Sequence, residues 1–318
     1  MNLAACVLLY GLVVAVLGPP LLARASRRGA TPRLGIAAWS AAALSVVGSW
    51  VLAGGLVAAE VWRARDFTEQ LVRGCAATVG VALTGRYGAA AQTGVVLLAV
   101  LVLSAGVLGV RFGSSLLRAR RDSHRHSDAA RVLGRHEETT ADVVVLDAPE
   151  RVAYCVAGRP ATIVVTRGAL AALDDAQLEA VLAHERAHLA GRHHLLVVIS
   201  RALAVAMPRL RLFTTGAAEI ARLVEMCADD AAAHRHGGQT VAGALLALAG
   251  ASALPAPALG ATATGVVERV ERLLDPARRA RATASQLAML VSVVLLLVGP
   301  ALGTILLELG AAMCDMAV

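Results

Sequence analysis

The sequence predicts a mainly α-helical integral membrane protein, in which about four transmembrane helices carry a cytoplasmic α+β domain. Three observations lead to this fold class. Of the 318 residues 57% are hydrophobic and only 17% are charged, and the mean hydropathy of +0.66 is far above that of a soluble domain. Uncharged stretches long enough to cross a bilayer occur four times. The segment 113–284 contains all nine histidines and most of the charge.

The four apolar stretches each approach or exceed the roughly 20 residues that a helix needs to cross the hydrocarbon core. They are Leu3 to Leu22, Leu34 to Ala59, Thr93 to Val110 and Ser285 to Leu307. The first is expected to be an uncleaved anchor, because its basic residues follow the apolar stretch instead of preceding it as in a signal peptide. The predicted parts are three N-terminal spans (1–112), a cytoplasmic domain (113–284), and a fourth span with a short outer tail (285–318).

Arginine distribution predicts the orientation, since short loops rich in arginine stay cytoplasmic. Arginines without acids follow the first span (Arg24, Arg27, Arg28, Arg33), open the segment after the third, and precede the fourth. We therefore expect a multi-pass protein of the cell membrane with both termini outside. Much of the net charge of +7 lies beside the spans, where it meets the lipid bilayer. Direct binding of nucleic acid is not expected, because the chain has no lysine and few aromatic residues for base stacking.

The cytoplasmic domain begins with β-branched runs and continues with helices. The runs 142–146 and 161–166, with 151–156 between them, predict a small antiparallel sheet of about three strands. Asp174 with Gln177 fits a capping box at the start of the long helix that follows. The five cysteines form no CxxC pair, so neither structural disulfides nor cysteine-bound zinc is expected.

This long helix contains the sequence His-Glu-Arg-Ala-His at 184–188. Residues four apart share a helix face, so His184 and His188 can bind one cation. Glu185 lies one step round the helix and can reach a metal-bound water without binding the metal itself. Two core or solvated histidines are the alternative, but the neighbouring residues are apolar, and burying unpaired imidazoles there would be costly.

A second helix, expected from an N-cap at Thr215 to His236, offers a third ligand. Glu225 and Asp229 are four residues apart, so one carboxylate can bind the metal while the other orients a ligand imidazole. A solvated acidic face is the alternative. Two histidines and a glutamate leave an open water position, which is the ligand set of catalytic zinc. One Zn2+ per chain is therefore expected, with peptide hydrolysis as the reaction and Glu185 as the catalytic base.

With these residues the chain resembles the BlaR/MecR-type membrane zinc metallopeptidases, antirepressor peptidases of the gluzincin type that are related to HtpX-type and CAAX-prenyl proteases. The resemblance covers the whole length in outline and is most specific from Val143 to Asp229. It implies zinc on His184, His188 and Glu225, with Glu185 as base and Asp229 supporting a ligand. One departure concerns the penicillin-binding sensor domain, which is expected to be lacking, since without lysine its Ser-x-x-Lys cannot occur.

The resemblance also implies substrate-binding residues. Ala153, Tyr154 and Cys155 would belong to an edge strand to which an extended substrate adds, and Arg269 would contact substrate or transition state. An ordinary half-buried strand and a plain amphipathic helix are the alternatives. One further histidine could donate a hydrogen bond that stabilises the oxyanion, and the alternative for each candidate is a solvated or interfacial side chain. The candidates are His193, His194, His234 and His236.

Three functions follow as hypotheses. The first is a regulatory zinc metalloendopeptidase whose protein substrate is a cytoplasmic winged-helix repressor of the BlaI/MecI type. The others are HtpX-like quality control of membrane proteins and a catalytically inactive signalling scaffold. A homodimer is left open. The apolar stretch Leu195 to Met207 is too short to cross upright, so it is expected to pack on the sheet or dip into the membrane surface, with a fifth span as the alternative.

Overall fold

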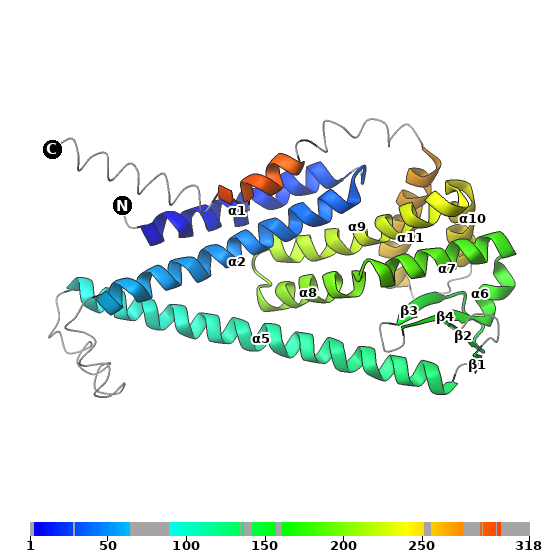
Figure 1. Ribbon diagram of the computed structural model, residues 1–318, viewed down its shortest axis with the longest axis horizontal. Helices are drawn as coiled ribbons and strands as arrows, with labels where there is room; N and C mark the ends of the chain where they lie inside the picture. The colour runs from blue at the N-terminus through cyan, green and yellow to red at the C-terminus, as the bar shows by residue number, and fades with distance from the viewer. Residues whose placement is uncertain are drawn as a thin grey trace.

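Two long apolar helices lie at one end of the molecule, a small sheet with shorter helices lies at the other, and a third long helix runs along the molecule to the sheet (Figure 1). The computed structural model describes residues 3–27, 29–63, 89–133, 135–136, 142–156, 161–250, 256–275, 287, 289–296 and 298–299. The long helices are α1 (Leu3–Ser26), α2 (Pro32–Arg63) and α5 (Ala89–Leu133). Within them Leu3–Ser26, Pro32–Ala59 and Val102–Arg121 are long and apolar enough to cross a membrane. The predicted mainly α-helical membrane architecture is confirmed.

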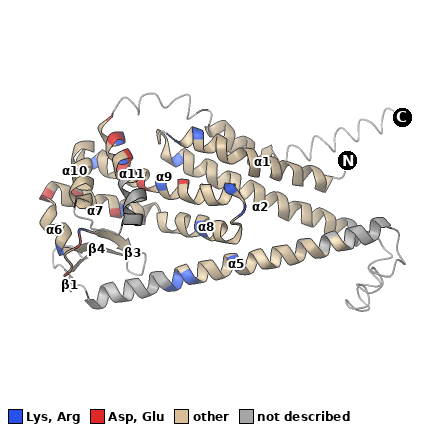
Figure 2. Cartoon of the chain, turned by 180° about the vertical axis from the view of Figure 1, so that it is seen from behind, with Lys and Arg blue, Asp and Glu red and all other residues tan. Residues whose placement is uncertain are grey.

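The predicted fourth span, Ser285 to Leu307, lies largely outside the described residues. Its described pieces between 287 and 299 are helical. Tyr10 of α1 donates a hydrogen bond to the backbone carbonyl of Leu296 over 3.2 Å, which places this segment beside α1. In Figure 2 the acidic residues gather at the end of the molecule that contains the sheet, and α1 and α2 carry few charges along their length.

The sheet has the strand order β1-β2-β4-β3. Its strands are β1 (Arg135–His136), β2 (Val143–Leu146), β3 (Ala153–Val156) and β4 (Thr162–Thr166). β2 and β4 run parallel, so the expectation of a purely antiparallel sheet was wrong. The cause is burial: every residue of β4 is buried, which suits the central position, whereas three of the four β3 residues are only half-buried and take the edge. After β2 the chain therefore forms the edge strand β3 first, and β4 then lies between β2 and β3.

Helix α7 (Asp175–Ala190) follows the short α6 (Arg167–Ala172) and crosses the sheet. Its predicted capping box is confirmed: the Asp174 side chain accepts from the Gln177 backbone amide, and the Gln177 side chain accepts from the Asp174 amide. After α7 the chain turns at Arg192, whose φ of 49° is left-handed, and α8 (His193–Ala206) leaves at 60°.

Helix α8 does not pack on the sheet, which corrects the first expectation for Leu195 to Met207. It lies between α5 and α9 (Arg211–His236), where Leu196, Val197 and Leu203 join the apolar cluster around Trp39. These side chains find more apolar surface among the long helices than on the small sheet, which explains the placement. Together α7 and α8 are long and apolar enough to form one membrane span that is bent by 60°.

Helix α9 begins at Arg211 with Leu210 as N-cap, one turn before the predicted cap at Thr215. Burial of Leu212 and Phe213 against α1 and α2 favours this earlier start. Its end at Gly237 is as expected, since Gly237 adopts a φ of 84° that favours glycine. Two helices follow, α10 (Gly238–Ala249) and α11 (Ala256–Leu274), and both pack beside α9 and close the domain.

Candidate metal centre

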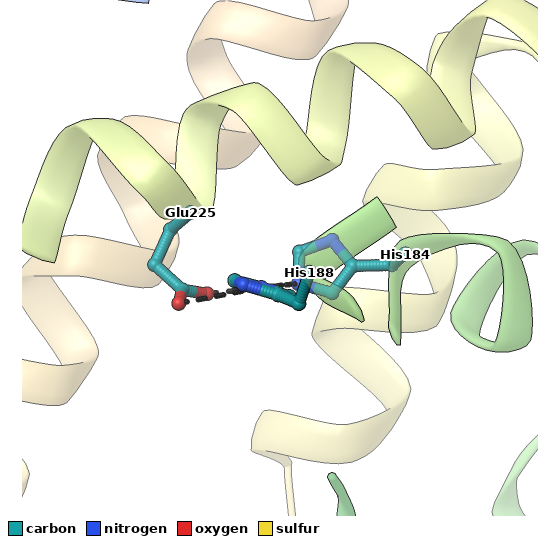
Figure 3. Close-up of side chains that lie close together, drawn as sticks. All are labelled: His184, His188 and Glu225. Atoms are coloured by element: carbon teal, nitrogen blue, oxygen red, sulfur yellow. Dashed lines mark hydrogen bonds and ion pairs between the residues drawn. The ribbon is translucent and has the colours of Figure 1, made fainter. Parts of the chain in front are cut away.

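Helices α7 and α9 bring His184, His188 and Glu225 together (Figure 3). One donor atom from each lies within 4.8 Å of the others. The two Nε2 atoms are 3.1 Å apart, and the Glu225 carboxylate oxygens lie 3.6 Å from Nε2 of His184 and 3.5 Å from Nε2 of His188. Three donor atoms this close together suit a single cation, and two nitrogens with one oxygen are the donors of catalytic zinc. The residues therefore fit a metal ion.

Asp229 supports this arrangement from one turn further along α9. Its fully buried carboxylate lies 3.1 Å from Nδ1 of His184. With a proton held on Nδ1 by Asp229, Nε2 is the nitrogen of His184 that can bind a metal ion, which is the arrangement that a metal ligand needs. Burial would raise the pKa of Asp229, but hydrogen bonds from Arg269 and His184 lower it to about 2, so Asp229 is ionised at neutral pH.

Carboxylates outnumber cationic side chains in this cluster. Glu185, Glu225 and Asp229 face one guanidinium, that of Arg269. Burial alone would lower the pKa of His184, yet hydrogen bonds to Asp229 and Glu225 raise it to about 9. The site thus has an electrostatic preference for a positive charge, which a divalent cation would meet.

Arg269 of α11 lies in the site, where its guanidinium contacts two carboxylates of the protein itself. Its Nε and Nη2 atoms each donate to Asp229 over 2.7 Å, and Nη1 lies 3.3 Å from Glu225. This fork holds the carboxylates of Asp229 and Glu225 in place. Sequence reasoning singled out Arg269 for contact with substrate, and pairing with Asp229 was not anticipated, because no local pattern links residues 40 positions apart.

Glu185 is 9% exposed and lies against the edge strand β3. Burial raises the pKa of Glu185, against the effect of His184 and of hydrogen bonds from the thiol and backbone amide of Cys155. The pKa of Cys155 is raised to about 12, first by burial and then by the charge of Glu185, so its thiol stays protonated. Of the predicted substrate residues, Ala153 and Cys155 pack on the side of the sheet that faces α7, whereas Tyr154 packs with Leu146 and Val164 on the other.

His193 takes a place that the sequence did not specify. Its Nδ1 lies 3.1 Å from Nδ1 of His188, and its side chain is buried behind that ligand. The other candidate oxyanion donors lie elsewhere: His194 and His234 are exposed, and His236 is at the end of α9. The one sequence signal for this position is that His193 follows His188 by five residues. The left-handed turn at Arg192 then brings its side chain back toward His188.

Comparison with known families matches the sequence model of peptidase family M48 to residues 116–228. The matched segment includes His184, Glu185, His188 and Glu225, and runs from α5 through the sheet into α9. No curated protein and no solved structure matches the chain. The match supports peptidase family M48, whose members are zinc metallopeptidases. With the apolar helices it supports a metal-dependent peptide hydrolase of membrane type at the level of the family.

Proposed function

We propose that this chain is a membrane-embedded zinc metalloendopeptidase in which His184, His188 and Glu225 hold the metal. The observation that carries the proposal is the convergence of their donor atoms within 4.8 Å, with Asp229 on the far nitrogen of His184. A catalytically inactive scaffold has no physical need for a complete ligand set beside a buried glutamate. The scaffold hypothesis is therefore the weaker one.

Glu185 is the proposed general base. A bound zinc ion would supply a water of lowered pKa and polarise the scissile carbonyl. Glu185 accepts a proton from the attacking water and passes it to the leaving amine. Its raised pKa suits this exchange, since a stronger base takes the proton more readily. The thiol and amide of Cys155 hold the carboxylate in place.

The substrate is proposed to bind as an extended strand along β3. Among the described strands β3 pairs only with β4, so its outer edge presents backbone donors and acceptors. Cys155 of β3 touches Glu185, and the metal ligands follow on the same helix. A peptide added at this edge would bring a carbonyl near the base and the ligand set, which favours an endopeptidase.

For the biological role, the BlaR/MecR resemblance favours regulatory cleavage of a cytoplasmic winged-helix repressor. The match to peptidase family M48, which does not single out that subtype, keeps quality control of membrane proteins as the second candidate. Comparing the proteomes of cells with wild-type protein and with Glu185→Gln separates the two. One stabilised repressor supports the first role, and many stabilised membrane-protein fragments support the second.

Metal analysis and proteolysis of the purified full-length protein test the enzyme itself. We expect about one zinc per chain, loss of zinc in His184→Ala, and retention of zinc in Glu185→Gln with proteolysis reduced at least about 100-fold. Zinc content and unfolding midpoint unaffected by His184→Ala would refute the metal site. Unchanged proteolysis by Glu185→Gln would refute the assigned base.

A further inference from the structure

A cavity of about 1040 Å³ lies on the face of α7 and α9 that points away from the metal ligands. Its walls come from the first turn of α2, from Ala183 and Ala187 of α7, from His193 of α8, and from α9 between Cys227 and Arg235. The chemistry proposed above uses none of this space. The cavity is therefore a separate feature of the fold.

Two guanidinium groups at this cavity have no acidic partner among the residues that the structure describes. Arg186 also lines the cavity, but it pairs with Asp142 over 2.9 Å, and the one lining acid, Asp230, pairs with Arg272 over 2.6 Å. Arg33 and Arg235 enter none of the ion pairs found in the described part of the chain, and both are exposed. The cavity thus carries an excess of positive charge.

Arg33 shares the cavity with side chains of other helices. Arg33 of α2, His193 of α8 and Cys227 of α9 all line it. The guanidinium of Arg33 therefore opens onto the same space as α8 and α9.

The first turn of α2 adds backbone donors at the same place. The first hydrogen bond of this helix runs from the Gly35 amide to the Thr31 carbonyl over 3.0 Å. The preceding amides of Arg33 and Leu34 therefore have no partner within the helix, and helix geometry directs them toward its N-terminal end. Such amides and arginine forks are the usual donors to phosphate oxygens.

The cavity lies where two candidate spans end. α1 ends at Ser26 and α2 begins at Pro32, on the side of the molecule that holds the sheet (Figure 1). Besides the arginines and other polar residues, its lining includes the apolar side chains of Leu34, Ile36, Ala190 and Leu196. A volume of about 1040 Å³ is much larger than one phosphate needs, and it leaves room for a glycerol unit and the start of an acyl chain.

We propose that this cavity binds a phosphate group, presented by the headgroup of an anionic phospholipid in the leaflet nearest the sheet. Arg33 and Arg235 hold the phosphate oxygens, and the apolar side chains of the lining take the start of an acyl chain. The occupant would contact both helices that carry the metal ligands, and His193 in its wall lies 3.1 Å from His188. Binding therefore stabilises the packing of α7 on α9.

Full-length protein in nanodiscs provides the test. Discs of phosphatidylcholine alone are compared with discs that also contain phosphatidylglycerol, and native mass spectrometry counts the lipids that stay bound. The test variant is the double substitution Arg33→Gln and Arg235→Gln. The matched control is Arg120→Gln with Arg121→Gln, which removes the same charge from exposed positions of α5. A further arm adds inorganic phosphate to phosphatidylcholine discs and follows the unfolding midpoint.

We expect retained phosphatidylglycerol in wild type and control, and at least about tenfold weaker retention in the test variant, because two phosphate contacts are lost. A variant with lysine at both positions keeps the charge without the fork and should lie between, which keeps the test valid if the glutamine variant does not fold. Protection by inorganic phosphate that depends on Arg33 and Arg235 would assign the site to soluble phosphate. Equal retention in test and control variants, or of both lipids, overturns the proposal.

Discussion

The carboxylate of Asp229 lies 3.1 Å from Nδ1 of His184 and is completely shielded from solvent. One carboxylate thereby sets the tautomer of a ligand imidazole, and the fork of Arg269 sets the carboxylate. The metal site therefore depends on a chain of contacts that runs through three helices, α7, α9 and α11. Each contact can be removed separately.

Asp229→Asn should weaken metal binding by about 10- to 100-fold, because a neutral amide holds the proton on Nδ1 of His184 less strongly than a carboxylate does. Competition with a fluorescent zinc chelator measures the affinity. Asp147→Asn is the control, since Asp147 is 82% exposed and, within the described part of the chain, its only ion pair is with Arg167 at the surface. An Asp229→Asn protein that binds zinc as tightly as wild type would show that the contact does not support the ligand.

Arg269→Gln should lower the free energy of unfolding by about 3 to 5 kcal/mol, because it leaves the buried charge of Asp229 without its main partner. Chemical denaturation in detergent, followed by circular dichroism, gives the value. For comparison, Arg167→Gln breaks an ion pair whose side chains are 63% and 82% exposed, and it should cost no more than about 1 kcal/mol. Equal losses in the two variants would contradict this account.

Gly168→Ala should destabilise the domain by about 1 to 3 kcal/mol through overpacking. A Cβ at this position would overlap the carbonyl oxygen of Pro149 and lie 2.6 Å from that of Glu150. Thr166 also donates to the Glu150 carbonyl, so the segment before β3 cannot move without loss. Gly113→Ala on α5 meets nothing within 4 Å and should be neutral or slightly stabilising by comparison. Thermal unfolding of both variants checks the difference.

Acid should weaken the ion pair between Asp142 and Arg186, which joins the start of the sheet to α7. The hydrogen bond from Arg186 lowers the pKa of Asp142 below 3.8, so the pair contributes stability above that pH and loses it as the pH falls through the folded value. Both side chains are partly exposed, so Asp142→Asn should cost less than about 1 kcal/mol at pH 7. The difference between variant and wild type should shrink as the pH falls through the folded pKa of Asp142, and a difference that acid leaves undiminished would contradict the assignment.

Local periodicity allowed the first metal ligands to be predicted without a structure. Residues four apart on a helix share a face whatever surrounds them, so His184 and His188 could be paired from their spacing. The capping box at Asp174 and the first three apolar helices follow equally from neighbours in sequence. Asp229 could be placed one turn from Glu225 for the same reason.

The rest depended on packing between distant segments. Burial on all sides decided that β4 takes the centre of a mixed sheet, and the apolar surface offered by α2, α5 and α9 decided where α8 lies. Three features of the structure depend on residues that are far apart in the chain or separated by a sharp turn. They are the pairing of Arg269 with Asp229, the position of His193 behind His188, and the cationic cavity beside α2. The sequence by itself determined the first three apolar helices, the capped helix and the residue types of the site, because these depend on local spacing and composition. Only the tertiary structure decided which faces meet, because the free energy of burial is summed over the whole molecule.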